Sequence, residues 1–330
     1  MCILLWTTAC AELGFPLILL SNRDEFSHRP TQAAGPWAQG NPIVYAGRDL
    51  ARAENGTWLG ITRGGRLAAL TNIREANPAA AIGPGSRGAI VSSFLMSLDL
   101  ECETWLECFK RNEFPSSAYP KPDQVGGFSM LCGKFIRSPE NKVKVSILSV
   151  VSNRADDEPT TPARNLTAID PAECKSHGLS NSAFANSWPK VLNGKSLLDQ
   201  LVEDICQNNM DEQEILTKAF DILSHDSVTT GTGWRASNNK LDLLKFSIFI
   251  PLFKVNEESN LTESQSNEKF SACGQPNSSH LYSHYGTQKQ TVIIVHDTGK
   301  VRYIEKTLFD WLQGGSVNNN IVDLSFDLDI

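Results

Sequence analysis

The chain has 330 residues, of which 41% are hydrophobic and 20% are charged, and its formal net charge at pH 7 is −7. These proportions are ordinary for a globular protein, and the acidic balance argues against a general nucleic-acid or anionic-membrane binder, which needs surplus Lys and Arg. Eight cysteines without a C-x-x-C pair indicate neither a disulfide framework nor a zinc knuckle.

The chain opens with two apolar runs, residues 3–9 and 16–21, which predict a buried hairpin. Glu12, Gly14 and Pro16 interrupt the apolar stretch, and no basic run precedes it. Neither a signal peptide nor a membrane-spanning helix is therefore expected here. We expect a reduced, cytosolic or organellar compartment.

The spacing of apolar residues predicts the elements that follow. They are a hairpin at 56–72, helices at 86–100 and 103–112, strands at 128–135 and 144–153, helices at 188–207 and 212–223, and a closing hairpin at 290–307. Ser187 is the expected N-cap of the helix that begins at Pro189. Strands at both ends with helices between them predict two packed antiparallel sheets covered by helices.

Residues 255–283 are rich in Ser, Asn and Glu and lack periodicity, which predicts a flexible insertion in a single domain spanning 1–330. His280 and His284 have the spacing of a metal pair on a helix, but they fall in or beside this insertion without a third ligand, so no metal site is expected. The sequence "GPGSRG" at 83–88 matches a dinucleotide-binding fingerprint literally, but no strand precedes it, which favours a helix entry.

Cys2 stands directly behind Met1. If Met1 is removed, Cys2 carries a thiol and a free α-amine, which titrate near pH 8.5 and 8, so a nucleophile would lie beside a base. The alternative is that Cys2 is only the first inward residue of an apolar strand.

Polar clusters follow three strand-like segments. The first, "SNRDEFSHRP" at 21–30, belongs to the hairpin partner of the strand that begins at Cys2, so we expect Cys2 to lie opposite residues 22–25. The second and third, at 69–75 and 177–182, contain Asn72 and Asn181, whose amide N–H groups are typical donors to a tetrahedral oxyanion. The alternative interpretation is that these are solvated strand ends with ion pairs.

Ten short motifs in the chain resemble those of the NRDE family, the relatives of transport and Golgi organisation protein two. They are "MCI", "SNRDE", "HRP", "GRD", "GTWLG", "LAALTNIRE", "SRG", "HGLSN", "WPKV" and "YGT". The resemblance implies an αββα four-layer sandwich of the N-terminal-nucleophile hydrolase type, of α+β class. It also implies a catalytic set of Cys2, Asp24, Asn72 and Asn181, and we expect Asn22, Arg23 and Arg74 to contact the substrate.

One departure from the family pattern concerns the motif Tyr-Gly-Thr-Arg, because this chain has Gln288 where the family has Arg. Either Lys289 or Arg23 supplies the missing charge, or the hydrolytic chemistry is weakened or lost.

Two functions follow from the resemblance, which connects the family with secretion, Golgi organisation, and haem and acyl-lipid homeostasis. The first is a hydrolase that uses Cys2 on an amide, ester or thioester. The second is a protein that uses the same site to bind and carry haem or an acyl-CoA or lipid. We expect that the protein requires no cofactor, with haem a possible ligand or cargo. The expected location is cytoplasmic, with mitochondrial or Golgi association as alternatives, and the expected partner is a small molecule rather than a nucleic acid or a bilayer.

Overall fold

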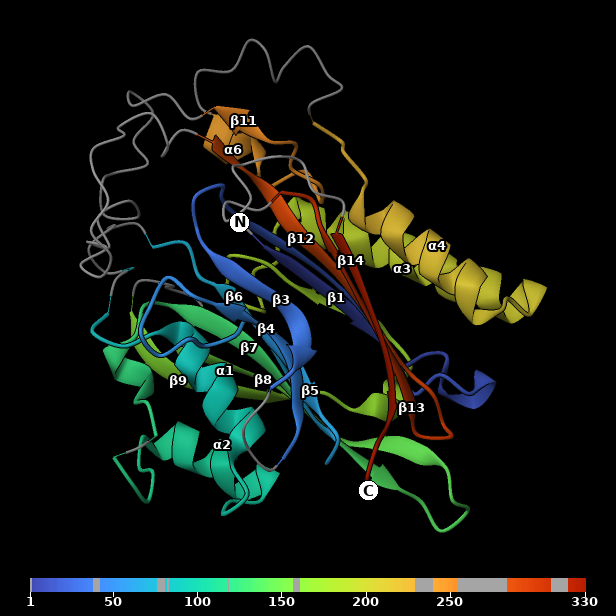
Figure 1. Ribbon diagram of the computed structural model, residues 1–330, viewed down its shortest axis with the longest axis horizontal. Helices are drawn as coiled ribbons and strands as arrows, with labels where there is room; N and C mark the ends of the chain where they lie inside the picture. The colour runs from blue at the N-terminus through green and yellow to red at the C-terminus, as the bar shows by residue number, and fades with distance from the viewer. Residues whose placement is uncertain are drawn as a thin grey trace.

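The computed structural model describes residues 2–37, 42–75, 81, 83–117, 119–156, 161–228, 240–254, 284–309 and 320–330. The insertion predicted at 255–283, with His280, lies outside the described residues. The described chain forms four layers, with two antiparallel sheets face to face and helices on the outer face of each (Figure 1). The predicted αββα four-layer sandwich is confirmed.

The first sheet combines strands from both ends of the chain. Its strand order is β10 (Ser176–Leu179), β1 (Ile3–Thr7), β2 (Leu17–Phe26), β12 (His284–Val295), β13 (Lys300–Thr307) and β14 (Asn320–Asp327), and β11 (Phe253–Lys254) pairs with β12. The hairpin of β1 and β2 is the one predicted, and Gly14 closes it at a φ of 91°, which favours glycine. The central pair, β2 and β12, thus joins residues that are 259 to 278 positions apart in the sequence.

The second sheet runs in chain order as a meander. Its strands are β3 (Thr31–Pro36), β4 (Val44–Asp49), β5 (Leu59–Thr62), β6 (Arg66–Asn72), β7 (Phe128–Arg137), β8 (Val143–Arg154) and β9 (Pro162–Ala168). β3, β4 and β9 were not predicted from the sequence, because their mixed burial gives no clean alternation of apolar residues.

Each sheet has its own pair of covering helices. α1 (Arg87–Met96) and α2 (Cys102–Arg111) pack on the second sheet, and α3 (Pro189–Asn208) and α4 (Glu212–Leu223) pack on the first. Short helical segments complete the described chain: η1 (Ala11–Leu13), η3 (Pro122–Gln124), η4 (Pro171–Glu173) and α6 (Lys240–Leu243). Alternate residues of β1 pack in two different hydrophobic cores. Leu4 and Trp6 lie between the sheets, whereas Ile3 and Leu5 face α3 and α4.

Two helix boundaries differ from the sequence prediction. α1 ends at Met96 rather than near residue 100, because the Arg66 guanidinium donates to the carbonyls of Phe94 and Leu100 and so satisfies the chain end. The predicted N-cap at Ser187 is wrong, since Trp188 occupies that position and the Ser187 hydroxyl donates to the Phe184 carbonyl at 3.4 Å.

A partly buried ionic cluster connects the two sheets at one end of the sandwich. Arg23 of β2 donates to the Asp49 carboxylate of β4 at 2.7 Å, and Arg29 donates to the same oxygen at 2.8 Å. The Arg23 guanidinium also lies 4.7 Å from the ring centre of Trp58. Gly47 leaves room for that ring, because a Cβ there would lie 2.7 Å from a Trp58 carbon.

The cluster determines how two carboxyl groups titrate. Burial alone would raise the pKa of Asp49, but the guanidinium groups of Arg29 and Arg23 lower it to about 2. Burial would likewise raise the pKa of Glu25, and the same two guanidinium groups lower it. A carboxyl whose pKa is lower in the folded state stabilises the fold above its unfolded pKa, near 3.8, and that stabilisation is lost as the pH falls toward the folded value.

We predict that Asp49→Asn reduces the free energy of unfolding at pH 7 by about 2 kcal/mol, which is the free-energy equivalent of the pKa shift. The loss relative to the unchanged protein should shrink between pH 4 and pH 2, as the Asp49 carboxylate is itself protonated. Urea unfolding at pH 7 and at pH 3 measures both effects. The control is Asp329→Asn, which removes a carboxylate that is 62% exposed in its pair with Arg63 and should change stability little. Equal losses for the two variants would contradict the role of the cluster.

Candidate functional site

Strand register determines the surroundings of Cys2. In β1 and β10, Leu4 pairs with Leu179, so two residues further the same register places Cys2 beside Asn181. In β1 and β2, Ile3 pairs with Asn22, so one residue further Cys2 stands opposite Arg23. The expectation that Cys2 faces residues 22–25 is confirmed. Cys2 is half-buried, and the Ser180 hydroxyl donates to its carbonyl at 2.7 Å.

Asp24 lies next to Cys2 and is held from several elements. The Cys2 thiol lies 3.9 Å from the Asp24 carbonyl oxygen. The Thr287 hydroxyl donates to the Asp24 carboxylate at 2.8 Å, and the Tyr285 hydroxyl donates to the Asp24 carbonyl at 3.1 Å. Residues 285–287 are the "YGT" motif of the sequence, so this motif of β12 orients the carboxylate.

A lysine from the helix layer completes the surroundings of Asp24. The Lys190 ammonium lies 3.7 Å from the Asp24 carboxylate, and both side chains are fully buried. Burial lowers the pKa of Lys190, while the charges of Asp24 and of ionised Cys2 act in the opposite direction. Lys190 belongs to the "WPKV" motif, but no role for it was predicted from the sequence. The sequence feature that could have indicated this role is the position of the lysine on the apolar face of a predicted helix, next to Val191.

Asn181 and Asn72 join the two sheets beside Cys2. The Asn181 side-chain amide donates to the Asn72 carbonyl at 2.7 Å, and the Arg74 main-chain N–H donates to the Asn181 carbonyl at 2.9 Å. Asn181 is 6% exposed and Asn72 is half-buried. An amide NH₂ has two hydrogens, so Asn181 keeps one for a further acceptor.

The segment after Asn72 is anchored by a buried ion pair. The Arg154 guanidinium donates to Glu75 with N–O distances of 2.7 and 2.8 Å, and the Gly127 N–H donates to the same carboxylate oxygen at 3.1 Å. The Glu75 side chain has no exposed surface. This anchor fixes the turn that presents Asn72 and Arg74.

The three residues expected to contact substrate lie in different surroundings. The Asn22 amide donates to the carbonyls of Leu223 and Ile248, and its side chain is fully buried toward the helix layer. Arg23 faces the other sheet, in the ionic cluster described above. Arg74 is 38% exposed and pairs with Asp242 at 3.2 Å. Of the three, Arg74 is the one that solvent reaches.

Gln288 lies in a bulge of β12, where the register with β2 shifts between Thr287 and Lys289. Its side-chain oxygen accepts a hydrogen bond from Arg23, and its amide donates to the Arg29 carbonyl at 3.2 Å. Lys289 points elsewhere, since its ammonium bonds Glu305 at 3.2 Å and Thr307 at 2.8 Å. The cation beside Gln288 is therefore Arg23 rather than Lys289.

The arrangement combines a thiol, a buried carboxylate with its ammonium partner, and an amide donor at the meeting point of both sheets. These are the parts that nucleophilic acyl transfer uses. In the described part of the chain, no three His, Cys, Asp or Glu side chains are arranged to hold a metal ion. Among the described helices, none combines the length and apolarity needed to cross a bilayer.

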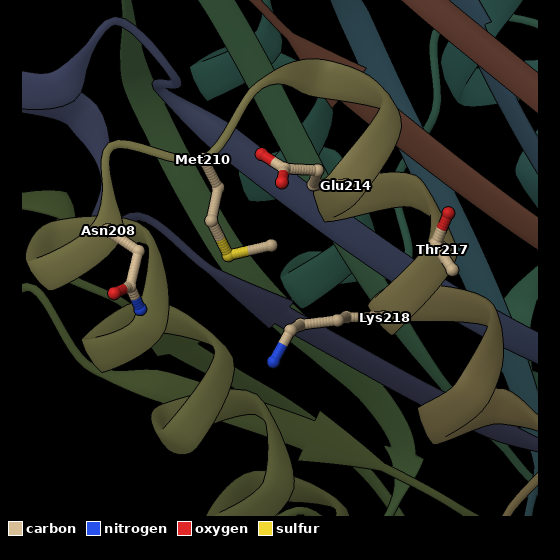
Figure 2. A pocket seen from close by; sticks show the side chains of 5 residues that line it. All are labelled: Asn208, Met210, Glu214, Thr217 and Lys218. Atoms are coloured by element: carbon tan, nitrogen blue, oxygen red, sulfur yellow. The ribbon is translucent and has the colours of Figure 1, made fainter.

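A separate hollow lies where α3 turns into α4, with five residues around it: Asn208, Met210, Glu214, Thr217 and Lys218 (Figure 2). Asn208 is the last residue of α3 and Lys190 is its second, so the helix rise separates them by about 27 Å. The hollow is thus not part of the Cys2 site.

One family model matches this chain in comparisons with known proteins. The family model described as Transport and Golgi organisation 2 matches residues 1–310. A bovine Transport and Golgi organization protein 2 homolog is 30% identical over 214 residues, covering 64% of this chain and 67% of that protein. A mouse homolog is 25% identical over 299 residues, covering 90% of this chain and 88% of that protein. A solved N-acylethanolamine-hydrolyzing acid amidase ortholog from Caenorhabditis elegans is 13% identical, with a TM-score of 0.44 over 74% of this chain and 97% of that one. The chain belongs to the Transport and Golgi organisation 2 family.

Proposed function

We propose that the protein is a hydrolase that uses Cys2 as the nucleophile on an amide, ester or thioester. The observation that supports this proposal is that Cys2 lies between Asp24 of β2, whose main-chain carbonyl is 3.9 Å from the thiol, and Asn181 at the end of β10, beside which the strand register places it. A strand-end cysteine with only a packing role needs neither group. The proposal requires that Met1 is removed, so that the α-amine of Cys2 is free.

The reaction then proceeds in two steps. The thiol sulfur attacks the acyl carbonyl carbon, the thiol proton passes to the α-amine, and Asp24 orients the resulting ammonium. The free N–H of Asn181 donates to the oxyanion of the tetrahedral intermediate. The intermediate collapses, the leaving amine, alcohol or thiol takes the proton, and water then hydrolyses the thioester to release the acid and restore Cys2.

Gln288 favours a second candidate, a protein that binds haem or an acyl-CoA or lipid at the same site without turnover. The family resemblance places an Arg at this position, and here the neighbouring guanidinium of Arg23 is paired with Asp49 and Gln288. A paired guanidinium is a poor partner for developing negative charge. Incubation with haem and with long-chain acyl-CoA, followed for binding and for turnover, separates the two candidates.

We predict that the protein forms a covalent acyl-enzyme on Cys2. Brief incubation with palmitoyl-CoA or a p-nitrophenyl ester, followed by an acid quench, should add the mass of one acyl group to the N-terminal peptide. Intact mass should also show that Met1 is absent. Cys2→Ala should abolish the adduct and the turnover, while Cys206→Ala, which changes an exposed cysteine of α3, should leave both unchanged. Retention of Met1, or turnover that survives in Cys2→Ala, would contradict the proposal.

We predict that Asn181→Ala slows acylation by a factor of about 100 or more, as the loss of one oxyanion donor does elsewhere. Alkylation of Cys2 by iodoacetamide should keep its rate, because displacement of iodide forms no oxyanion. Stopped-flow acylation and mass-spectrometric alkylation rates measure the two reactions. Asn186→Ala is the matched control, since Asn186 is exposed in the same segment and its amide bonds the Asp156 carbonyl. Equal slowing of acylation and alkylation would indicate a distorted site instead of a lost donor.

A further inference from the structure

Lys190 is a fully buried lysine at the start of α3, and the hydrolytic steps above do not use it. Its position is fixed by close packing of the helix on the first sheet. A Cβ on Gly194 would lie 2.7 Å from Leu5, and a Cβ on Gly178 would lie 2.8 Å from Val191, so glycines permit this approach. The main-chain N–H of Lys190 donates to the Lys245 carbonyl at 3.0 Å. The ammonium is therefore held at the strand end where Cys2 begins.

Burying an ion pair carries a desolvation free energy that burying an apolar side chain of the same volume does not. Two charges that are removed from water lose solvation free energy, and their mutual attraction offsets this loss only in favourable geometry. Apolar residues of similar volume often stabilise a protein equally well. Burial also disfavours the charged form of Lys190, and Asp24 and ionised Cys2 oppose this. The structure thus retains a cation where packing alone would favour a Leu or Met.

Several elements packed near this cation carry charged or titratable groups. These groups are Asp24 and Arg23 from β2, Tyr285 from β12, Cys2 before β1, and Lys245 with Asp242 from the segment around α6. Arg23 is balanced by Asp49 of the second sheet and by Glu25 of its own strand. Asp242 pairs with Arg74 and Lys245 at the surface. The fully buried pair of Lys190 and Asp24 therefore lies one residue contact from the thiol, whose sulfur is 3.9 Å from the Asp24 main-chain carbonyl oxygen.

We propose that Lys190 is a positioning residue that offsets the negative charge of the Asp24 carboxylate next to Cys2 and so favours the Cys2 thiolate. Without the Lys190 ammonium, 3.7 Å away, less of the Asp24 negative charge would be offset, and this charge would oppose ionisation of the thiol. With Lys190 the pair is neutral, and any α-ammonium of Cys2 then adds a net positive charge. The effect on catalysis rests on the proposed function, but the effect on the thiol does not.

The experiment measures the rate of Cys2 alkylation by iodoacetamide as a function of pH. In Lys190→Met and Lys190→Gln the midpoint should rise by about one pH unit or more, the usual effect of losing a nearby opposite charge. Lys190→Arg keeps the charge and should keep the midpoint. Lys195→Met, which removes a lysine from the same helix, is the control and should leave the midpoint unchanged. Unchanged midpoints in folded Met and Gln variants would overturn the proposal.

A second measurement leaves Lys190 in place, in case its variants do not fold. Coupling between two ionisable groups is reciprocal, so removal of the thiolate must lower the pH at which Lys190 loses its proton. NMR titration of ¹³Cε-labelled lysines in the unchanged protein and in Cys2→Ala should show one lysine midpoint moving to lower pH. Identical lysine titrations in the two proteins would overturn the proposal. A shifted alkylation midpoint without an acyl-enzyme would reject the hydrolase while keeping the role of Lys190.

Discussion

The pair between the Lys190 ammonium and the Asp24 carboxylate is the interaction on which the Cys2 site depends. Neither partner can be buried alone, because an unpaired charge in the interior costs several kcal/mol. The pair therefore ties the first turn of α3 to the end of β2, and Thr287 from β12 donates to the other oxygen of the same carboxylate. Three elements that are distant in the sequence are fixed at one point, and that point lies beside Cys2.

Strand pairing supplies the rest of the geometry. β1 has β2 on one side and β10 on the other, so a cysteine just before β1 necessarily lies between the ends of its two neighbours. The second sheet reaches the same place through Asn72, whose carbonyl accepts from Asn181. A one-residue slip in either register would turn these side chains to the opposite face.

The sequence predicts those parts of the fold that are local. The hairpin of β1 and β2 follows from two apolar runs and a short turn, and antiparallel pairing alone then brings Cys2 near Asp24. Asn181 and Asn72 could be proposed only from their position at strand ends and the family resemblance, since their contact crosses two sheets. Lys190 was not identified, because a lysine is usually assigned to the surface, although its position beside Val191 on the apolar face of the predicted helix was a signal that tertiary packing buries it. The prediction that Ser187 is the N-cap of α3 was wrong for a related reason. Tertiary contacts of Trp188 and of the main chain at the start of α3 determine where this helix begins.

The two sides of Cys2 differ in how their charge is arranged. Toward the second sheet, Arg23 is enclosed by Asp49, Gln288 and the Trp58 ring, so its cation is balanced and rigid. An arginine at position 288 would bring a second guanidinium against Arg23, whereas a glutamine offers it an acceptor. Toward the helix layer, Lys190 and Asp24 form a fully buried ion pair at 3.7 Å. In the proposed arrangement the helix side offsets the charge next to Cys2, whereas the cluster on the other side links β2 to β4 of the second sheet.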